Sequence, residues 1–136
     1  MADYMTGRDT IGIEKSVHEI YKQLTEGNNP TDSPFKSMKD VFMWAAVVGF
    51  QNGEPLSIDG KREVVFRWAQ LSPQTDIPLL KAMAIATGKE FDVLLDRDTI
   101  LTIAEEYANA GIREIQQELL GQSGQPLWNL VSLIKS

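Results

Sequence analysis

The longest apolar stretch of the sequence, residues 41–50, contains no charged residue and no polar side chain. It follows Ser33-Pro34, a pair that is typical of a helix start because serine caps free amide groups and proline fits the first helical turn. A helix that is apolar on every side has to be surrounded by other elements. We therefore predict a helix over about 35–50 at the centre of the fold, and a small residue such as Gly49 would let a neighbouring helix come close.

Six further segments repeat apolar residues at helical spacing between capping residues, glycines or prolines. They cover residues 10–26, 61–71, 76–87, 99–110, 112–120 and 126–134. Asp9 or Thr10 would cap the first of them and Asp98 the fourth, while Gly111 would separate the fourth from the fifth. A short helical turn is also expected around residues 91–95.

The segment at 61–71 has features of both a helix and a strand. Val64-Val65-Phe66 has strand propensity, yet Val64, Val65 and Trp68 share one helical face. A strand needs a partner to be stable, and the sequence shows no second convincing strand. We therefore favour a short helix here.

These segments predict an all-α fold, a single-domain irregular or orthogonal bundle of six or seven helices around a buried central helix (about 35–50). A length of 136 residues fits one domain. The single helical domain would span residues 1–136, with a flexible N-terminus at 1–8.

Composition excludes several classes of function. The chain has no cysteine, which rules out disulfides, thiolate metal sites and cysteine nucleophiles. Its longest apolar run is shorter than the roughly 20 residues that a membrane-spanning helix needs. The acidic N-terminus lacks the basic-then-apolar pattern of a secretory signal. We expect a cytoplasmic protein.

The charge is unevenly distributed along the chain, whose net charge is −6. The total argues against tight unaided binding to nucleic acid, because affinity for the phosphate backbone comes from lysine and arginine. Only the middle of the chain, residues 33–89, has a positive balance, with 7 basic and 5 acidic side chains. Its candidate contacts for a partner or for DNA are Lys36, Lys39, Lys61, Arg62 and Arg67.

No residue pattern indicates catalysis, a cofactor or a metal ion. The single histidine, His18, lies four residues after Glu14, a spacing that is common on helix surfaces. Residues 96–101 superficially resemble a calcium loop, but Leu101 stands where such loops need glycine. We expect Glu105-Glu106 to face water. The glycine-rich residues 121–125 lack the lysine and the preceding strand of a phosphate-binding loop.

Three segments resemble one known family. They are Ser33-Pro34-Phe35-Lys36-Ser37-Met38-Lys39-Asp40-Val41-Phe42-Met43 and the residues up to Phe50, then Phe66-Arg67-Trp68-Ala69-Gln70-Leu71-Ser72, and Ile103-Ala104-Glu105-Glu106-Tyr107-Ala108-Asn109-Ala110-Gly111-Ile112. The family is DNA phosphorothioation-associated protein 4, also called Dnd system-associated protein 4. The resemblance covers nearly the whole chain beyond the first predicted helix, and its first segment is the most specific.

The resemblance implies a place beside the bacterial machinery that replaces a non-bridging phosphate oxygen of DNA by sulfur, and beside the linked restriction genes. It implies no catalytic residue. The sulfur chemistry itself needs a desulfurase and an iron–sulfur protein, and a chain without cysteine can be neither. The leading hypothesis is a non-enzymatic accessory or adaptor protein, with other proteins of a DNA-modification or restriction locus as partners.

Three alternatives stay open at this point. The region 36–89 could form a helical DNA-binding module, with helix-turn-helix geometry sought in residues 61–88. Acidic residues 96–106 could hold magnesium in a metal-dependent hydrolase, provided that they converge. The apolar surplus of the central helix could serve a homodimer instead of an intramolecular core.

Overall fold

The computed structural model describes residues 7–27, 33–88, 90, 92, 95–121 and 126–135. In this part of the chain, five α-helices accompany a two-stranded antiparallel sheet. The elements are β1 (Thr10–Glu14), α1 (His18–Thr25), α2 (Met38–Asn52), β2 (Arg62–Arg67), α3 (Asp76–Ala86), α4 (Arg97–Ile115), a π-helical segment η4 (Gln116–Leu120) and α5 (Pro126–Lys135). Short 3-10 helices, Lys15–Val17 and Trp68–Gln70, follow the two strands. The predicted all-α bundle of six or seven helices is therefore wrong, and the fold is mixed.

The two strands replace parts of two predicted helices. β1 pairs with β2 from Thr10 opposite Arg67 to Glu14 opposite Arg62, with a bulge between Ile11 and Gly12. The apolar residues of β1 fit a strand as well as the start of a helix, and the first helix begins only at His18. Since the partner strand lies about fifty positions along the chain, neither segment shows its pairing locally.

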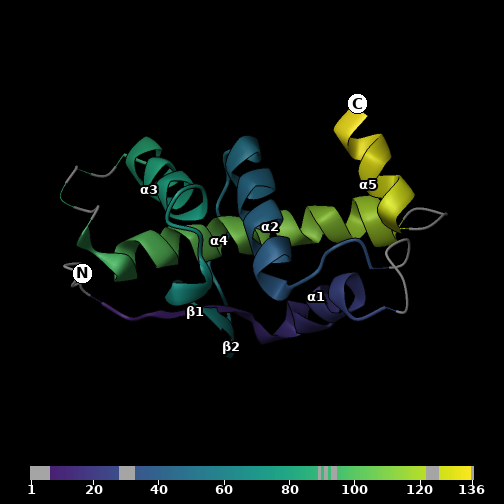
Figure 1. Cartoon of the computed structure of the whole chain (residues 1–136), viewed down its shortest axis with the longest axis horizontal. Coiled ribbons are helices and arrows are strands. Elements are labelled where there is room, and N and C mark those ends of the chain that lie inside the picture. Colours follow the sequence, from purple (N-terminus) through teal and green to yellow (C-terminus); the bar gives the residue numbers. More distant parts are fainter. Residues whose placement is uncertain are drawn as a thin grey trace.

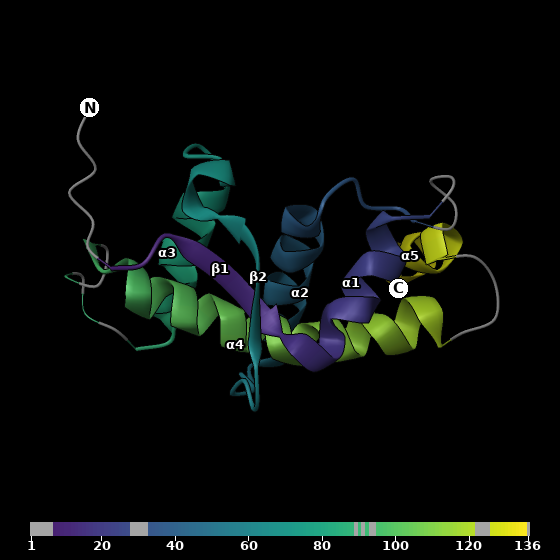
Figure 2. The ribbon, with the colours of Figure 1, turned by 90° about the horizontal axis from the view of Figure 1, so that it is seen from below.

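Helix α4 is the spine of the molecule (Figure 1). In Figure 1, α3 and α5 extend above α4, the sheet and α1 lie below it, and α2 crosses it. Seen from below, in Figure 2, these elements lie along one face of α4. The apolar residues of α4 from Ile100 to Ile115 are buried, except for the half-buried Ala110. The hydrophobic core therefore lies along α4, and α2 covers only part of it.

The closest approach in the core is the crossing of α2 and α4, which form the most extensive contact between any two elements. Gly49 of α2 lies against the backbone of Tyr107, and Gly111 of α4 lies against the backbone of Ala45. A Cβ atom at either glycine would collide with the facing carbonyl oxygen. The predicted role of Gly49 in close helix packing is confirmed.

Several predicted helix ends differ from those observed. α2 begins at Met38 with Ser37 as its cap, because the Ser37 hydroxyl accepts a hydrogen bond from the Asp40 amide at 3.3 Å. The hydroxyl of Ser33 instead donates to the Gln23 carbonyl oxygen at 2.7 Å, which holds the chain against α1. Helix α2 also has an open side, where Trp44 is 37% exposed.

Helix α4 is continuous through Gly111 and joins two predicted helices into one. Its cap is Asp96 and not Asp98, since the Asp96 carboxylate accepts the Thr99 amide at 3.3 Å. Helices α3 and α5 begin as predicted, and Gly88 follows α3 in the left-handed conformation that favours glycine. Of the predicted turn at 91–95, residues 91, 93 and 94 lie outside the described residues. None of the helices described is both long enough and apolar enough to span a bilayer.

Candidate functional site

Glu105 of α4 is a buried carboxylate at the centre of an ionic cluster. Its side chain is 4% exposed, so the prediction that it faces water is wrong. Arg8 Nη1 and Arg62 Nη2 each donate to Oε2 at 2.7 Å. The amide of Gly12, at the bulge of β1, donates to the same oxygen at 2.8 Å. The cluster therefore ties the N-terminal segment, β2 and α4 together.

The hollow beside Glu105 is polar and has a volume of about 430 Å³. Its arginines are already engaged, because Arg8 also donates to the Thr10 carbonyl oxygen at 2.9 Å and to the Thr102 hydroxyl at 3.2 Å. Arg62 donates to the same Thr10 carbonyl oxygen at 3.0 Å. Both guanidinium groups bind the buried carboxylate that lies between them, so their hydrogen bonds are made within the protein. The cluster functions as an internal clamp.

Glu14, at the end of β1, is the centre of a second clamp. Its carboxylate accepts hydrogen bonds from the Ser16 hydroxyl, from the Asp59 amide at 2.9 Å and from Arg113 Nη2 at 2.8 Å. These bonds, chiefly the one from Ser16, lower the pKa of Glu14 to about 2. Because Glu14 belongs to a strand, it does not share a helical face with His18.

We expect acid to weaken the fold through Glu14. Its pKa is about 2 in the folded protein against an ordinary 4.5, so the unfolded chain takes up the proton first. The stability that Glu14 contributes is therefore complete above pH 4.5 and is lost as the pH falls towards 2. Urea unfolding between pH 7 and pH 2 measures it. Glu14→Gln should be less stable than the native chain at pH 7 and should lose less stability on acidification; parallel pH profiles would contradict the assignment.

The acidic residues of 96–106 do not converge. The Asp96 side chain accepts from the hydroxyl of Thr99 at 2.8 Å, and this bond lowers the pKa of Asp96. Asp98 accepts the amide of Arg8 at 3.0 Å, and Glu105 is held by its arginines. Within the residues that the structure describes, no three histidine or acidic side chains gather as ligands for a metal ion. The magnesium hydrolase therefore has no geometric support.

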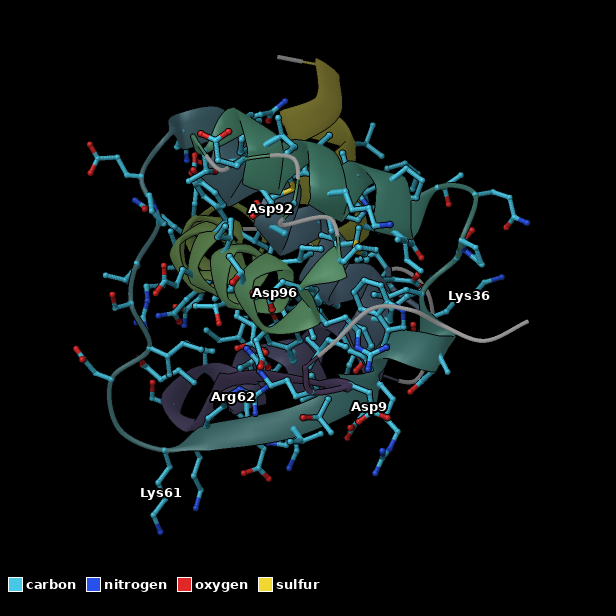
Figure 3. All side chains as sticks on the ribbon, turned by 90° about the vertical axis from the view of Figure 1, so that its left-hand side faces the viewer. Asp9, Lys36, Lys61, Arg62, Asp92 and Asp96 are labelled. Carbon is cyan, nitrogen blue, oxygen red and sulfur yellow. The ribbon has the colours of Figure 1, made fainter. Side chains whose placement is uncertain are left out.

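The structure does not bring the five predicted basic contacts together. Three of them are held in ion pairs: Arg62 with Glu105 at 2.7 Å, Lys39 with Asp76 at 3.0 Å, and Arg67 with Asp9 at 3.3 Å. The other two, Lys36 and Lys61, project into solvent at opposite sides of the molecule (Figure 3).

The residue types alone favour a core position for both Trp44 and Trp68, because large apolar side chains are usually buried, but the two environments differ. Trp68, after β2, is 8% exposed and has the guanidinium group of Arg97 at 5.9 Å from its ring centre. Its place in the core is confirmed. Trp44 is 37% exposed, and the ring of Phe35 packs edge-on against it at 6.1 Å between centroids. The core prediction for Trp44 is therefore wrong, and its ring is held at the surface.

Trp44 lines an apolar hollow between α2 and α3, which we call the α2–α3 groove. The groove has a volume of about 300 Å³ and is lined by Met43, Trp44, Val47, Asp76 and Leu79. Leu79 of α3 is 40% exposed, so both helices present a large apolar side chain to solvent. The ion pair between Lys39 and Asp76 joins the two helices beside it.

A second hollow continues the α2–α3 groove towards α5. It has a volume of about 420 Å³ and shares Met43, Trp44 and Asp76 with the groove. Its further lining comes from Pro34, Phe35, Lys36, Asp40 and Leu130. Lys36, which the sequence predicted as a partner contact, therefore lines a hollow of mixed polar and apolar character that adjoins the groove.

Comparison with known proteins places the chain in a family. No curated protein and no solved structure matches it. Residues 11–136 match the family described as DNA sulphur modification system-associated protein 4. The matched region includes β1 except for Thr10, the whole of β2, the five described helices and every residue of the α2–α3 groove. The chain therefore belongs to the family of DNA sulphur modification system-associated protein 4.

Proposed function

We propose that this chain is a non-enzymatic accessory protein of a bacterial DNA phosphorothioate modification-restriction system. It acts as an adaptor by binding another protein of that system through the α2–α3 groove. Family membership supports the association with DNA sulphur modification. The observation that carries the adaptor role is the groove itself, an apolar hollow in which Trp44 and Leu79 stay exposed.

The groove has the composition of a protein-binding site. Tryptophan is among the residues that contribute most to binding energy. Such side chains contribute most when they are held rigidly in a hollow from which the bound partner excludes water. The ring of Phe35 packs edge-on against that of Trp44, and the Lys39–Asp76 ion pair links the two helices beside the groove. Little reorganisation is needed before a partner binds, which favours affinity.

A helical DNA-binding module has less support. The helix-turn-helix that was sought in residues 61–88 is not formed, because residues 62–67 are strand β2. Of the five predicted basic contacts, Arg62, Lys39 and Arg67 are held in ion pairs, and Lys36 and Lys61 lie at separate sides of the molecule (Figure 3). Asp40 and Asp76 also line the second hollow, and carboxylates repel the phosphate backbone.

Co-purification from native cells tests the proposal. We expect the tagged chain to recover proteins of the modification or restriction machinery in equal amounts with and without nuclease treatment. Recovery that nuclease abolishes would mean that DNA bridges the proteins, and it would contradict an adaptor held by protein contacts. Failure to recover any such protein would contradict the proposal as a whole.

A further inference from the structure

The α2–α3 groove has the shape of a seat for a third helix. Its lining comes from one face of each flanking helix, Met43, Trp44 and Val47 of α2 and Asp76 and Leu79 of α3. These residues are spaced by one, three or four positions, so their side chains form the ridges that pack against another helix. An amphipathic helix binds such a surface through apolar side chains one turn apart.

The chain's own C-terminal helix is not free to fill the groove. α5 packs against η4, where the Asn129 side chain donates to the Leu119 carbonyl oxygen at 2.9 Å. α5 of a second copy is also a poor match in charge, since residues 126–135 contain one lysine and no acidic residue, and each copy carries a net charge of −6. These observations favour a different protein as the occupant.

The charges along the combined surface define the partner further. Lys39 lies between Asp40 and Asp76, with its Nζ atom 3.8 Å and 3.0 Å from their carboxylates. The charged residues that line the second hollow are Lys36, Asp40 and Asp76. Of these, Lys36 has no ion-pair partner among the described residues. A complementary helix therefore carries a carboxylate at the end that reaches Lys36.

We propose that the α2–α3 groove binds an amphipathic α-helix of another protein of the modification system, with apolar residues at positions i and i+3 or i+4 between Trp44 and Leu79 and an aspartate or glutamate against Lys36. This inference rests on the proposed adaptor function. It goes further by committing to the secondary structure and the charge of the occupant.

Site-specific photo-crosslinking in native cells tests the inference. A photoreactive amino acid replaces Leu79 in the groove or, as a control, Leu56, which is exposed to a similar extent at 42% against 40%. We expect the probe at position 79 to label one protein of the system, at a peptide with helical apolar spacing and an acidic residue, and the probe at position 56 to label none.

Lys36→Glu should weaken the association by about five- to tenfold at low salt. Exchange of the partner's acidic residue for lysine should restore it.

The remaining outcomes separate the two proposals. Labelling of a second copy of this chain, of DNA, or of a peptide without that pattern would overturn the inference. Labelling from position 56 and not from position 79 would overturn the inference and the assignment of the groove as the binding surface, whereas the association with the modification system would stand, provided that co-purification survives nuclease. An absence of co-purification with the native chain would overturn both.

Discussion

Replacing Gly111 with alanine should unfold the protein or destabilise it by roughly 3 kcal/mol or more, because the added methyl group has no space. A Cβ atom at this position would collide with the carbonyl oxygen of Ala45, and a backbone atom in the middle of a packed helix cannot move aside. The expected loss of stability has the opposite sign to the effect of helix propensity, which favours alanine over glycine by about 1 kcal/mol in an exposed helix. Urea unfolding followed by circular dichroism measures the difference.

Ala86→Gly on the exposed end of α3 is the matched control. It should cost at most about 1 kcal/mol, which is the effect of propensity alone. A Gly111→Ala protein as stable as the native chain would show that α2 and α4 do not cross closely at this point.

Glu105→Ala should destabilise the fold by about 3 kcal/mol, as expected when one partner of a buried ionic cluster is removed. The change leaves the amide of Gly12 without its acceptor and removes the carboxylate from between Arg8 and Arg62. Glu105→Gln keeps the shape and loses the charge, so its cost should be intermediate. Equilibrium unfolding at neutral pH measures all three proteins.

The neighbouring Glu106→Ala is the control, because no side-chain partner of Glu106 is seen in the described part of the chain. Its effect should be within about 0.5 kcal/mol of zero, as for most surface substitutions. Equal losses in the two alanine variants would contradict the clamp.

Local patterns in the sequence predicted the helices that lie between clear start and stop residues. α3 follows Thr75 and ends before Gly88, and α5 begins at Pro126, as the capping residues and proline indicate. Non-local pairing could not be predicted in this way. β1 and β2 are distant in sequence and pair only after α2 has brought the chain back beside β1. The apolar pattern of each strand, taken alone, also fits a short helix.

Two further errors have a common physical cause. Gly111 was treated as a break between helices and Glu105 as a solvated charge, whereas both are buried positions of α4 that depend on partners from elsewhere in the chain. A signal was present for Glu105, because it lies four residues after Leu101 and three before Ala108, within the buried face. A charge on an apolar helical face indicates a buried ion pair.

The candidate site was only partly predictable. Lys36 was identified from the charge balance, and it lines the second hollow beside Trp44. The groove itself was not predictable, because Trp44 and Leu79 belong to helices that are separate in sequence. Only the packing of α2 and α3 on α4 leaves both side chains exposed.

The central claim is that this protein binds a partner of the DNA sulphur modification system through the α2–α3 groove. Nuclease-resistant co-purification with Leu79→Glu and Leu56→Glu variants tests it most directly, since both changes place one new charge on a similarly exposed leucine. We predict that Leu79→Glu reduces recovery of the partner by about tenfold or more, as for loss of an interface anchor, and that Leu56→Glu leaves it unchanged. Equal recovery with the two variants would contradict the claim.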